Sequence, residues 1–159
     1  MRVGLGVDVH AFAGPADERR LILGGVEIPS ERGLLGHSDA DVLSHAVTDA
    51  LLGAAGLEDI GHYFPDTDAR WRDADSVELL REVRRIVGDA WEVANVDAVV
   101  VCERPKIRDH REAMRKNLAA ALGVDRSQVG VRGTTSERLG FTGRGEGIAA
   151  QAVCLLRER

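Results

Sequence analysis

The sequence predicts an α+β fold in which helices pack on one face of a mixed β-sheet. Strand-like alternation of apolar residues dominates both ends of the chain, and stretches with helical spacing interrupt it without strict strand–helix alternation. The chain has 159 residues, of which 44% are hydrophobic and 30% are charged. This size and composition are typical of one globular domain, so we expect a single domain over residues 1–159.

The first third of the chain predicts two strands and a helix. Residues 1–10 and 21–28 alternate apolar with other side chains, and each range is expected to form one strand. Apolar residues then recur at helical spacing up to residue 55. Ser38 is the expected N-cap of this helix, and Gly56 is its expected end.

The rest of the chain predicts two helices and three strands. Residues 57–75 form a long connection, which is usually functional when it is ordered. A helix is expected over 76–87, with Ser76 as its cap, and another over 109–122. The remaining strands are expected at 93–102, 129–135 and 147–156.

Two of these expected strands are apolar on both faces, at residues 99–102 and 149–156. One face of the sheet is expected to meet the helices, so the other face needs a different partner. Oligomerisation through the sheet is a plausible way to cover it.

Charge and composition exclude several classes of partner. The formal net charge is −5 and no run of five basic residues occurs, so we expect no nucleic-acid partner. No window is long and apolar enough for a membrane span, and no targeting segment is recognisable, so we expect a cytoplasmic protein with no membrane partner. Cys102 and Cys154 lie in apolar runs, which favours buried thiols over a disulfide.

Three residues are candidates for a metal site. Asp8 and His10 are two apart on an expected strand and therefore share one face, and His45 falls nearly opposite the main apolar stripe of the first helix. Two imidazoles and one carboxylate are the ligand set of a catalytic zinc site. Asp41 or Asp49, one turn from His45, is a candidate acceptor that orients its ring. The alternative is a hydrogen-bonded strand-end pair and an unrelated surface histidine.

A second candidate site is the expected start of the first helix, at His37 and Ser38. Free backbone N–H groups at a helix N-terminus attract anions, and phosphate is the natural ligand. The alternative is that Ser38 only caps the helix.

The stretch 134–147 combines hydroxyls, arginines, one carboxylate and several glycines. Hydroxyls and Arg144 suit phosphate oxygens, and Glu137 suits a hard divalent cation held against them. Lys106, in the loop that follows an expected strand, is a further candidate for binding phosphate. The alternatives are an ordinary glycine-rich turn and a solvated lysine.

Taken together and in order, five segments make the chain resemble the 2-C-methyl-D-erythritol 2,4-cyclodiphosphate synthase family. They are Gly6-Val7-Asp8-Val9-His10, His37-Ser38-Asp39-Ala40-Asp41 leading to His45, Asp59-Ile60-Gly61 with Phe64-Pro65-Asp66-Thr67-Asp68, Pro105-Lys106, and the run from Thr134 to Gly147. The match extends from residue 1 almost to the C-terminus.

The resemblance implies an enzyme of the non-mevalonate isoprenoid pathway, a phosphorus–oxygen lyase. Its substrate would be 4-diphosphocytidyl-2-C-methyl-D-erythritol 2-phosphate, whose 2-phosphate attacks its own β-phosphorus and expels CMP. Asp8, His10 and His45 would bind zinc or another divalent transition metal, and Glu137 would hold magnesium or manganese. His37 and Thr135 would stabilise the transition state.

The resemblance also implies which residues contact the substrate. His37 and Ser38 would receive the 2-phosphate, and the metal ligands Asp8 and His10 would lie at the diphosphate. The erythritol part would meet Asp59, Gly61, Phe64, Asp66 and Asp68. The cytidine would meet Cys102, Lys106, Ile107, Arg108, Gly133 and Thr134, and Thr135 and Glu137 would also contact the substrate.

The family forms homotrimers with the sheets around the threefold axis and with active sites between neighbouring subunits. Phe141 and Arg144 would then lie near that axis, where the family has a cavity able to hold an isoprenoid-like diphosphate. Two other functions remain open at this point, a metal-dependent nucleotide phosphodiesterase that activates water and a non-catalytic trimer that binds metal and nucleotide.

Overall fold

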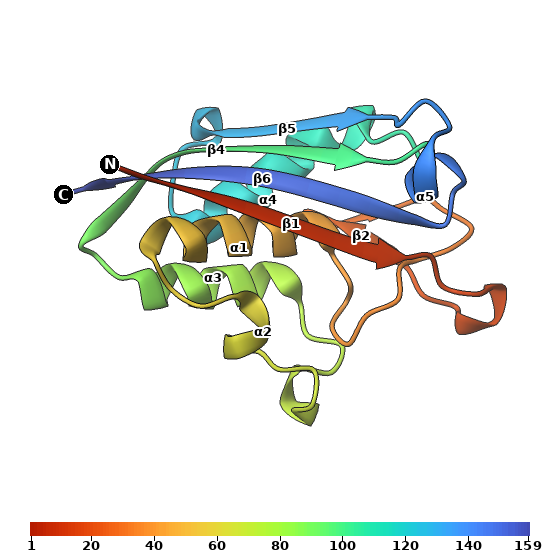
Figure 1. Ribbon diagram of the computed structural model, residues 1–159, viewed down its shortest axis with the longest axis horizontal. Coiled ribbons are helices and arrows are strands. Elements are labelled where there is room, and N and C mark those ends of the chain that lie inside the picture. Colours follow the sequence, from red (N-terminus) through yellow and green to blue (C-terminus); the bar gives the residue numbers. More distant parts are fainter.

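A four-stranded mixed sheet with the strand order β1-β6-β4-β5 forms the centre of the fold (Figure 1). The computed structural model describes all residues from 1 to 159. The strands are β1 (Arg2–Ala11), β4 (Trp91–Val101), β5 (Val129–Thr134) and β6 (Gly147–Glu158). Strands β4 and β5 are parallel, whereas β6 is antiparallel to both β1 and β4. This confirms the α+β class and the mixed sheet.

Three long helices cover one face of this sheet (Figure 1). They are α1 (Val42–Ala55), α3 (Ser76–Val87) and α4 (Arg111–Leu122). Helix α1 packs directly on β1 and β6 and is buried on nearly every side, because α3 packs against it in turn. None of the helices has the length and apolar character that crossing a bilayer requires.

Two glycines of β1 allow α1 to lie unusually close to the sheet. A Cβ atom on Gly4 would lie 2.1 Å from the Ala50 carbonyl oxygen, and one on Gly6 would lie 1.9 Å from that of Ala46. Such distances are impossible for a side chain, so only glycine fits at these two positions. The same face of β1 carries Asp8 and His10.

The alternation predicted one strand over residues 21–28, but this range forms a hairpin of two short strands. Strand β2 (Leu21–Leu23) pairs antiparallel with β3 (Val26–Ile28). Gly24 and Gly25 between them have φ values of 56° and 69°. Two consecutive residues with positive φ form the tight turn that suits a two-residue hairpin, and glycine adopts it without strain.

The predicted N-cap of α1 is also wrong, because Asp41 and not Ser38 caps this helix. The Asp41 carboxylate accepts a hydrogen bond from the Ser44 N–H at 3.0 Å. It also accepts from the backbone N–H groups of Gly24 at 2.9 Å and Gly25 at 2.8 Å. Burial raises the pKa of this fully buried carboxyl. Asp41 therefore occupies the helix N-terminus that was expected to attract a phosphate.

Asp75, rather than Ser76, caps α3 by accepting from the Val77 N–H at 2.8 Å. The long connection before this helix is ordered by a short helix, α2 (Ile60–Tyr63), and by a 3₁₀ turn at Ala69–Trp71. The other helices and strands begin and end within about two residues of the predicted positions.

The face of the sheet opposite the helices carries exposed apolar side chains. On β1 they alternate with the residues that face α1, and they are exposed by about half or more: Val3, Leu5, Val7 and Val9. Val153 of the neighbouring strand β6 is also exposed. The two cysteines, in contrast, are buried and unpaired, as expected.

Candidate functional site

The predicted functional residues gather at one end of the sheet. Strands β1 and β4 are both antiparallel to β6, and β5 is parallel to β4, so β1, β4 and β5 run in the same direction (Figure 1). Their carboxyl ends therefore meet at the same end of the sheet. Among the cavities at this end, one lies beside β1 and one beside β5.

The β1 cavity contains a cluster of three converging donor atoms. His45 Nδ1 lies 3.0 Å from Asp8 Oδ2 and 3.2 Å from His10 Nε2. His10 Nε2 in turn lies 2.9 Å from the same Asp8 oxygen. Three potential ligand atoms this close together can bind one cation, so the metal site predicted from Asp8, His10 and His45 has a matching geometry.

The close approach of α1 to β1 brings these residues together. Asp8 and His10 lie on the helix-facing side of β1, as their spacing predicted, directly after Gly4 and Gly6. Helix α1 lies against these glycines, and its first turn carries His45. The helical spacing correctly placed His45 outside the apolar stripe. The two glycines Gly4 and Gly6, which indicate that a helix packs closely on β1, were not used in that prediction.

The electrostatics of the cluster favour a charged carboxylate. Burial by itself raises the pKa of Asp8, but the hydrogen bonds and positive charge of His10 and His45 lower it more, so the net pKa is well below the usual value. Burial by itself lowers the pKa of His10, but the hydrogen bond to Asp8 and the charge of that carboxylate raise it by more. The net pKa of His10 is therefore above the usual value. Opposite charges thus stabilise each other here.

The candidate acceptors for the His45 ring, Asp41 and Asp49, are both wrong. Asp41 caps α1, and Asp49 accepts from the Ile60 N–H at 2.8 Å. His45 Nε2 instead lies 2.8 Å from Ser76 Oγ at the start of α3. That serine lies 31 residues further along the chain, beyond the reach of a helix-spacing argument.

The β1 cavity has a volume of about 310 Å³ and collects most residues expected at the erythritol part. Of the expected contacts, it is lined by Asp8, His10, His37, Ser38, Gly61, Phe64 and Asp66. The His37 ring donates from Nε2 to the Asp68 carbonyl oxygen at 3.0 Å. The side chains of Asp59 and Asp68 lie outside the lining, because Asp59 caps α2 and Asp68 pairs with Arg70.

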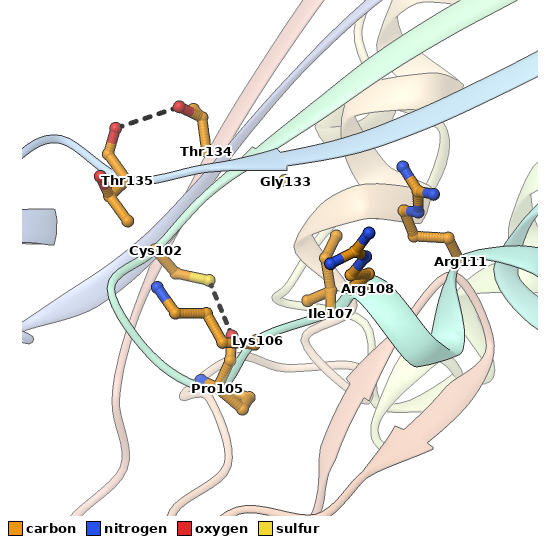
Figure 2. A pocket seen from close by; sticks show the side chains of 9 residues that line it. All are labelled: Cys102, Pro105, Lys106, Ile107, Arg108, Arg111, Gly133, Thr134 and Thr135. Atoms are coloured by element: carbon orange, nitrogen blue, oxygen red, sulfur yellow. Dashed lines mark hydrogen bonds between the residues drawn. The ribbon is translucent and has the colours of Figure 1, made fainter.

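The β5 cavity, of about 330 Å³, collects the residues expected at the nucleotide (Figure 2). Its lining is Cys102, Pro105, Lys106, Ile107, Arg108, Arg111, Gly133, Thr134 and Thr135. Seven of these nine were predicted by resemblance. Arg111 was missed, although its spacing from Arg108 puts both on one side of a helical turn. Its Nε is buried without a hydrogen-bond partner.

The wall of the β5 cavity includes a thiol that is not ionised at neutral pH. Cys102 Sγ donates to the Pro105 carbonyl oxygen at 3.4 Å (Figure 2). Burial raises the pKa of this thiol to about 11. Cys102 therefore contributes neutral surface, and the positive charge comes from Lys106, Arg108 and Arg111.

The glycine-rich segment begins directly beside the β5 cavity. Thr135 Oγ1 donates to Glu137 Oε1 at 2.6 Å, which holds this exposed carboxylate next to the cavity. Glu137 adopts a positive φ of 53°. Further along, a short helix α5 (Gly140–Gly143) carries the exposed Phe141, and Arg144 forms an ion pair with Glu146 at 2.8 Å.

Within one chain, the two cavities have no lining residue in common. Strands β1 and β5 are the outer strands of the sheet, and three strand spacings of about 4.8 Å separate them by about 14 Å. The residues expected to stabilise one transition state, His37 and Thr135, consequently lie in different cavities.

Comparisons with known proteins identify the family of the chain. A model of the YgbB family matches residues 1–157. The 2-C-methyl-D-erythritol 2,4-cyclodiphosphate synthase of Rubrobacter xylanophilus is 84% identical over 155 residues, covering 98% of this chain and 94% of that protein. The same enzyme from Moorella thermoacetica is 59% identical over 160 residues, covering 100% and 96%.

A solved structure of the Plasmodium falciparum protein, described as a complex with CDP, is similar with a TM-score of 0.85. Its sequence is 36% identical to this one, and the match covers 99% of this chain and 96% of that chain.

Proposed function

The chain belongs to the YgbB family and has the activity of the 2-C-methyl-D-erythritol 2,4-cyclodiphosphate synthases, and from this premise we propose how its residues divide the work. The reaction converts 4-diphosphocytidyl-2-C-methyl-D-erythritol 2-phosphate to the cyclic diphosphate and CMP, as a step of non-mevalonate isoprenoid synthesis. Because the nucleophile is a phosphate of the substrate itself, the protein must mainly neutralise charge and bring two phosphates together.

The observation that carries the proposal is the convergence of Asp8 Oδ2, His10 Nε2 and His45 Nδ1. Two imidazoles and one carboxylate fit zinc, or another divalent transition metal, with a position left for substrate. When bound, the metal supplies a Lewis acid that polarises an oxygen of the β-phosphate. Metal analysis of the purified protein, together with CMP release before and after chelation, tests this assignment.

The remaining side chains of the β1 cavity are proposed to position the attacking phosphate. Ser38 and His37 precede α1 and face the same cavity as the metal cluster. The carbonyl of Asp68 accepts from His37 Nε2 and so fixes the ring orientation. Gly61, Phe64 and Asp66 then enclose the erythritol part and limit the access of water.

The β5 cavity is proposed to bind the cytidine diphosphate part. Gly133 and Thr134 expose backbone groups at the end of β5, while Lys106 and Arg108 supply positive charge for phosphate oxygens. Thr135 lies on the side of this cavity nearest Glu137. Glu137 would hold magnesium or manganese against the α- and β-phosphates.

We further propose that the protein is a homotrimer in which the β1 cavity of one subunit faces the β5 cavity of the next. Two observations support this arrangement. The two cavities do not join within one chain, and the exposed apolar residues Val3, Leu5, Val7 and Val9 leave one side of the sheet uncovered. The unpaired buried cysteines suit the reducing cytoplasm, which is the proposed location.

Complementation between two inactive variants tests the shared site. His45→Ala removes a metal ligand from the β1 cavity, and Thr135→Ala alters the β5 cavity. If sites lie between subunits, co-expression gives some trimers with one intact site, and activity returns although neither variant is active alone. Mixed trimers without any recovered activity would contradict a shared site.

The chemistry is tested separately by running the reaction in water that contains heavy oxygen. Attack by the substrate's own phosphate consumes no water, so neither product should carry the label. Label in CMP or in the second product would indicate the phosphodiesterase reaction instead, in which the metal activates water.

A further inference from the structure

We propose that Ser76 and Asp39 are positioning residues that orient His45 and fix which of its ring nitrogens carries the proton. The proposal rests on the proposed metal site, because it concerns how tightly that site binds its ion. Neither residue belongs to the ligand set, and neither contacts the β5 cavity.

The two nitrogens of the His45 ring face different surroundings. Nδ1 points into the metal cluster, 3.0 Å from Asp8 Oδ2. Nε2 points the other way, 2.8 Å from Ser76 Oγ. A neutral imidazole carries one N–H and one lone pair, so Nδ1 can bind a metal only when the proton is on Nε2.

Ser76 must then accept a hydrogen bond from His45, and Asp39 provides the reason why it does. A hydroxyl can donate or accept, whereas a carboxylate accepts only. Ser76 Oγ donates to Asp39 Oδ1 in a short hydrogen bond, which uses its only proton. The lone pairs of Ser76 remain for the Nε2–H group of His45.

Asp39 is itself held in place by the backbone. Its carboxylate accepts from the Ser76 N–H at 3.2 Å and from the Asp41 N–H at 3.1 Å. Its own N–H donates to the Ala74 carbonyl oxygen at 3.0 Å. The segment before α1 and the start of α3 are therefore joined by hydrogen bonds at the point where Ser76, itself fully buried, meets the imidazole.

His10 reaches the same state by a simpler route. Its Nδ1–H donates to the Leu35 carbonyl oxygen at 2.5 Å, and a carbonyl can only accept. When a metal takes the place of the Nε2 proton, the Nε2 lone pair of His10 is thus directed into the cluster. The Ser76–Asp39 pair is the side-chain equivalent of this carbonyl, and unlike the carbonyl it can be removed by substitution.

Ser38 is a weaker second acceptor for His45. Its Oγ lies 3.2 Å from Nε2 and already accepts from the Ala40 N–H at 3.2 Å. We therefore expect that removing Ser76 weakens the site without abolishing it.

The test measures zinc affinity of the full-length protein by competition with a chromophoric chelator. Ser76→Ala should lower the affinity about 10- to 100-fold, the usual effect of losing a hydrogen bond to a metal-bound imidazole. Asp39→Asn should lower it less, because an amide oxygen still accepts from Ser76. Ser76→Thr, which keeps the hydroxyl, should restore most of the affinity.

Ser44→Ala is the matched control. Ser44 is also fully buried, and its Oγ also donates to a carboxylate, that of Asp41 at 2.7 Å, but no hydrogen bond joins its side chain to the His45 ring. This variant should lower the unfolding temperature of the metal-free protein and leave zinc affinity unchanged.

Three results would overturn the proposal. The first is wild-type zinc affinity in both Ser76→Ala and Asp39→Asn. The second is a loss of zinc affinity in Ser44→Ala equal to that in Ser76→Ala, since this would indicate a general loosening of the structure around the site. If Ser76→Ala fails to fold, unchanged affinity in Asp39→Ala, which removes the acceptor for the Ser76 hydroxyl, decides alone. Wild-type affinity in His45→Ala would instead show that the metal site itself is misassigned.

Discussion

The two cavities at the end of the sheet are built in opposite ways. In the β1 cavity three donor atoms lie within 3.2 Å of one another, and hydrogen bonds to Leu35 and Ser76 fix both imidazoles. In the β5 cavity Lys106 and Arg108 are exposed and have no ion-pair partner, and Gly133 offers only backbone.

The difference teaches where positional accuracy is needed. A metal requires several donors at fixed distances, so its site is fixed before the metal arrives. A flexible polyanion can be held by mobile charges that adjust to it, and a small error there costs less. We therefore expect large effects from substitutions in the β1 cavity and graded effects in the β5 cavity.

The largest effect should come from His45→Ala. Removing a ligand should lower kcat/KM by more than about 1000-fold, equivalent to more than about 4 kcal/mol of transition-state stabilisation. The circular dichroism spectrum should stay normal, because His45 lies at the edge of the core. CMP release and metal content are the measurements, and a near-normal rate with normal zinc content would refute the assignment.

A smaller effect is expected when the β5 cavity is narrowed. A Cβ on Gly133 would lie 2.9 Å from Ile107 Cγ1, so Gly133→Val must displace that side chain, which lines the same cavity. We expect KM to rise about tenfold, or about 1.4 kcal/mol, with zinc content unchanged.

The matched control for this variant is Gly53→Ala, where the added Cβ meets nothing closer than 3.8 Å. Its KM should equal that of the wild type. Equal KM values in the two glycine variants would contradict the proposal that the β5 cavity binds the nucleotide.

Glu137→Gln should change the requirement for the second ion. Loss of the carboxylate charge is expected to raise the magnesium or manganese concentration for half-maximal activity about tenfold, while activity at saturating ion largely recovers. Initial rates over a metal titration check this. Glu158→Gln, at the far end of β6, is the control, and identical titrations for both variants would exclude Glu137 as the ligand.

The smallest effect concerns the cysteines. Burial raises the thiol pKa of Cys102 to about 11 and that of Cys154 to about 12, so the reactive thiolate is scarcer in the folded protein. At pH 8 about one Cys102 thiol in a thousand is ionised, and iodoacetamide should react far more slowly than with the unfolded chain. Mass spectrometry checks this, and fast labelling of Cys102 would show that the β5 cavity wall opens.

The sequence predicted the fold class and most elements because the periods of burial are local properties of the chain. It failed at residues 21–28, where Gly24 and Gly25 were taken as part of an alternating strand although a double glycine favours a hairpin turn. The predicted N-cap of α1 was Ser38, whereas Asp41 caps the helix. Both residue types cap helices, and contacts with the hairpin, distant in sequence, decide between them.

For the site, motifs identified the side chains that line the two cavities, but not the groups that orient them. The partner of His45 was sought one helical turn away, whereas Ser76 comes from another helix. The separation of His37 from Thr135 within one chain also follows only from the strand order, which no local pattern contains.

Gly4 and Gly6 link metal binding to the engineering of stability. Replacing a strand glycine by alanine usually restricts the unfolded chain and so raises stability. Here an added methyl group would push α1, and with it His45, away from the strand that carries Asp8 and His10. The usual gain in stability is therefore lost at these two positions, and the metal centre is loosened by residues that never touch the ion.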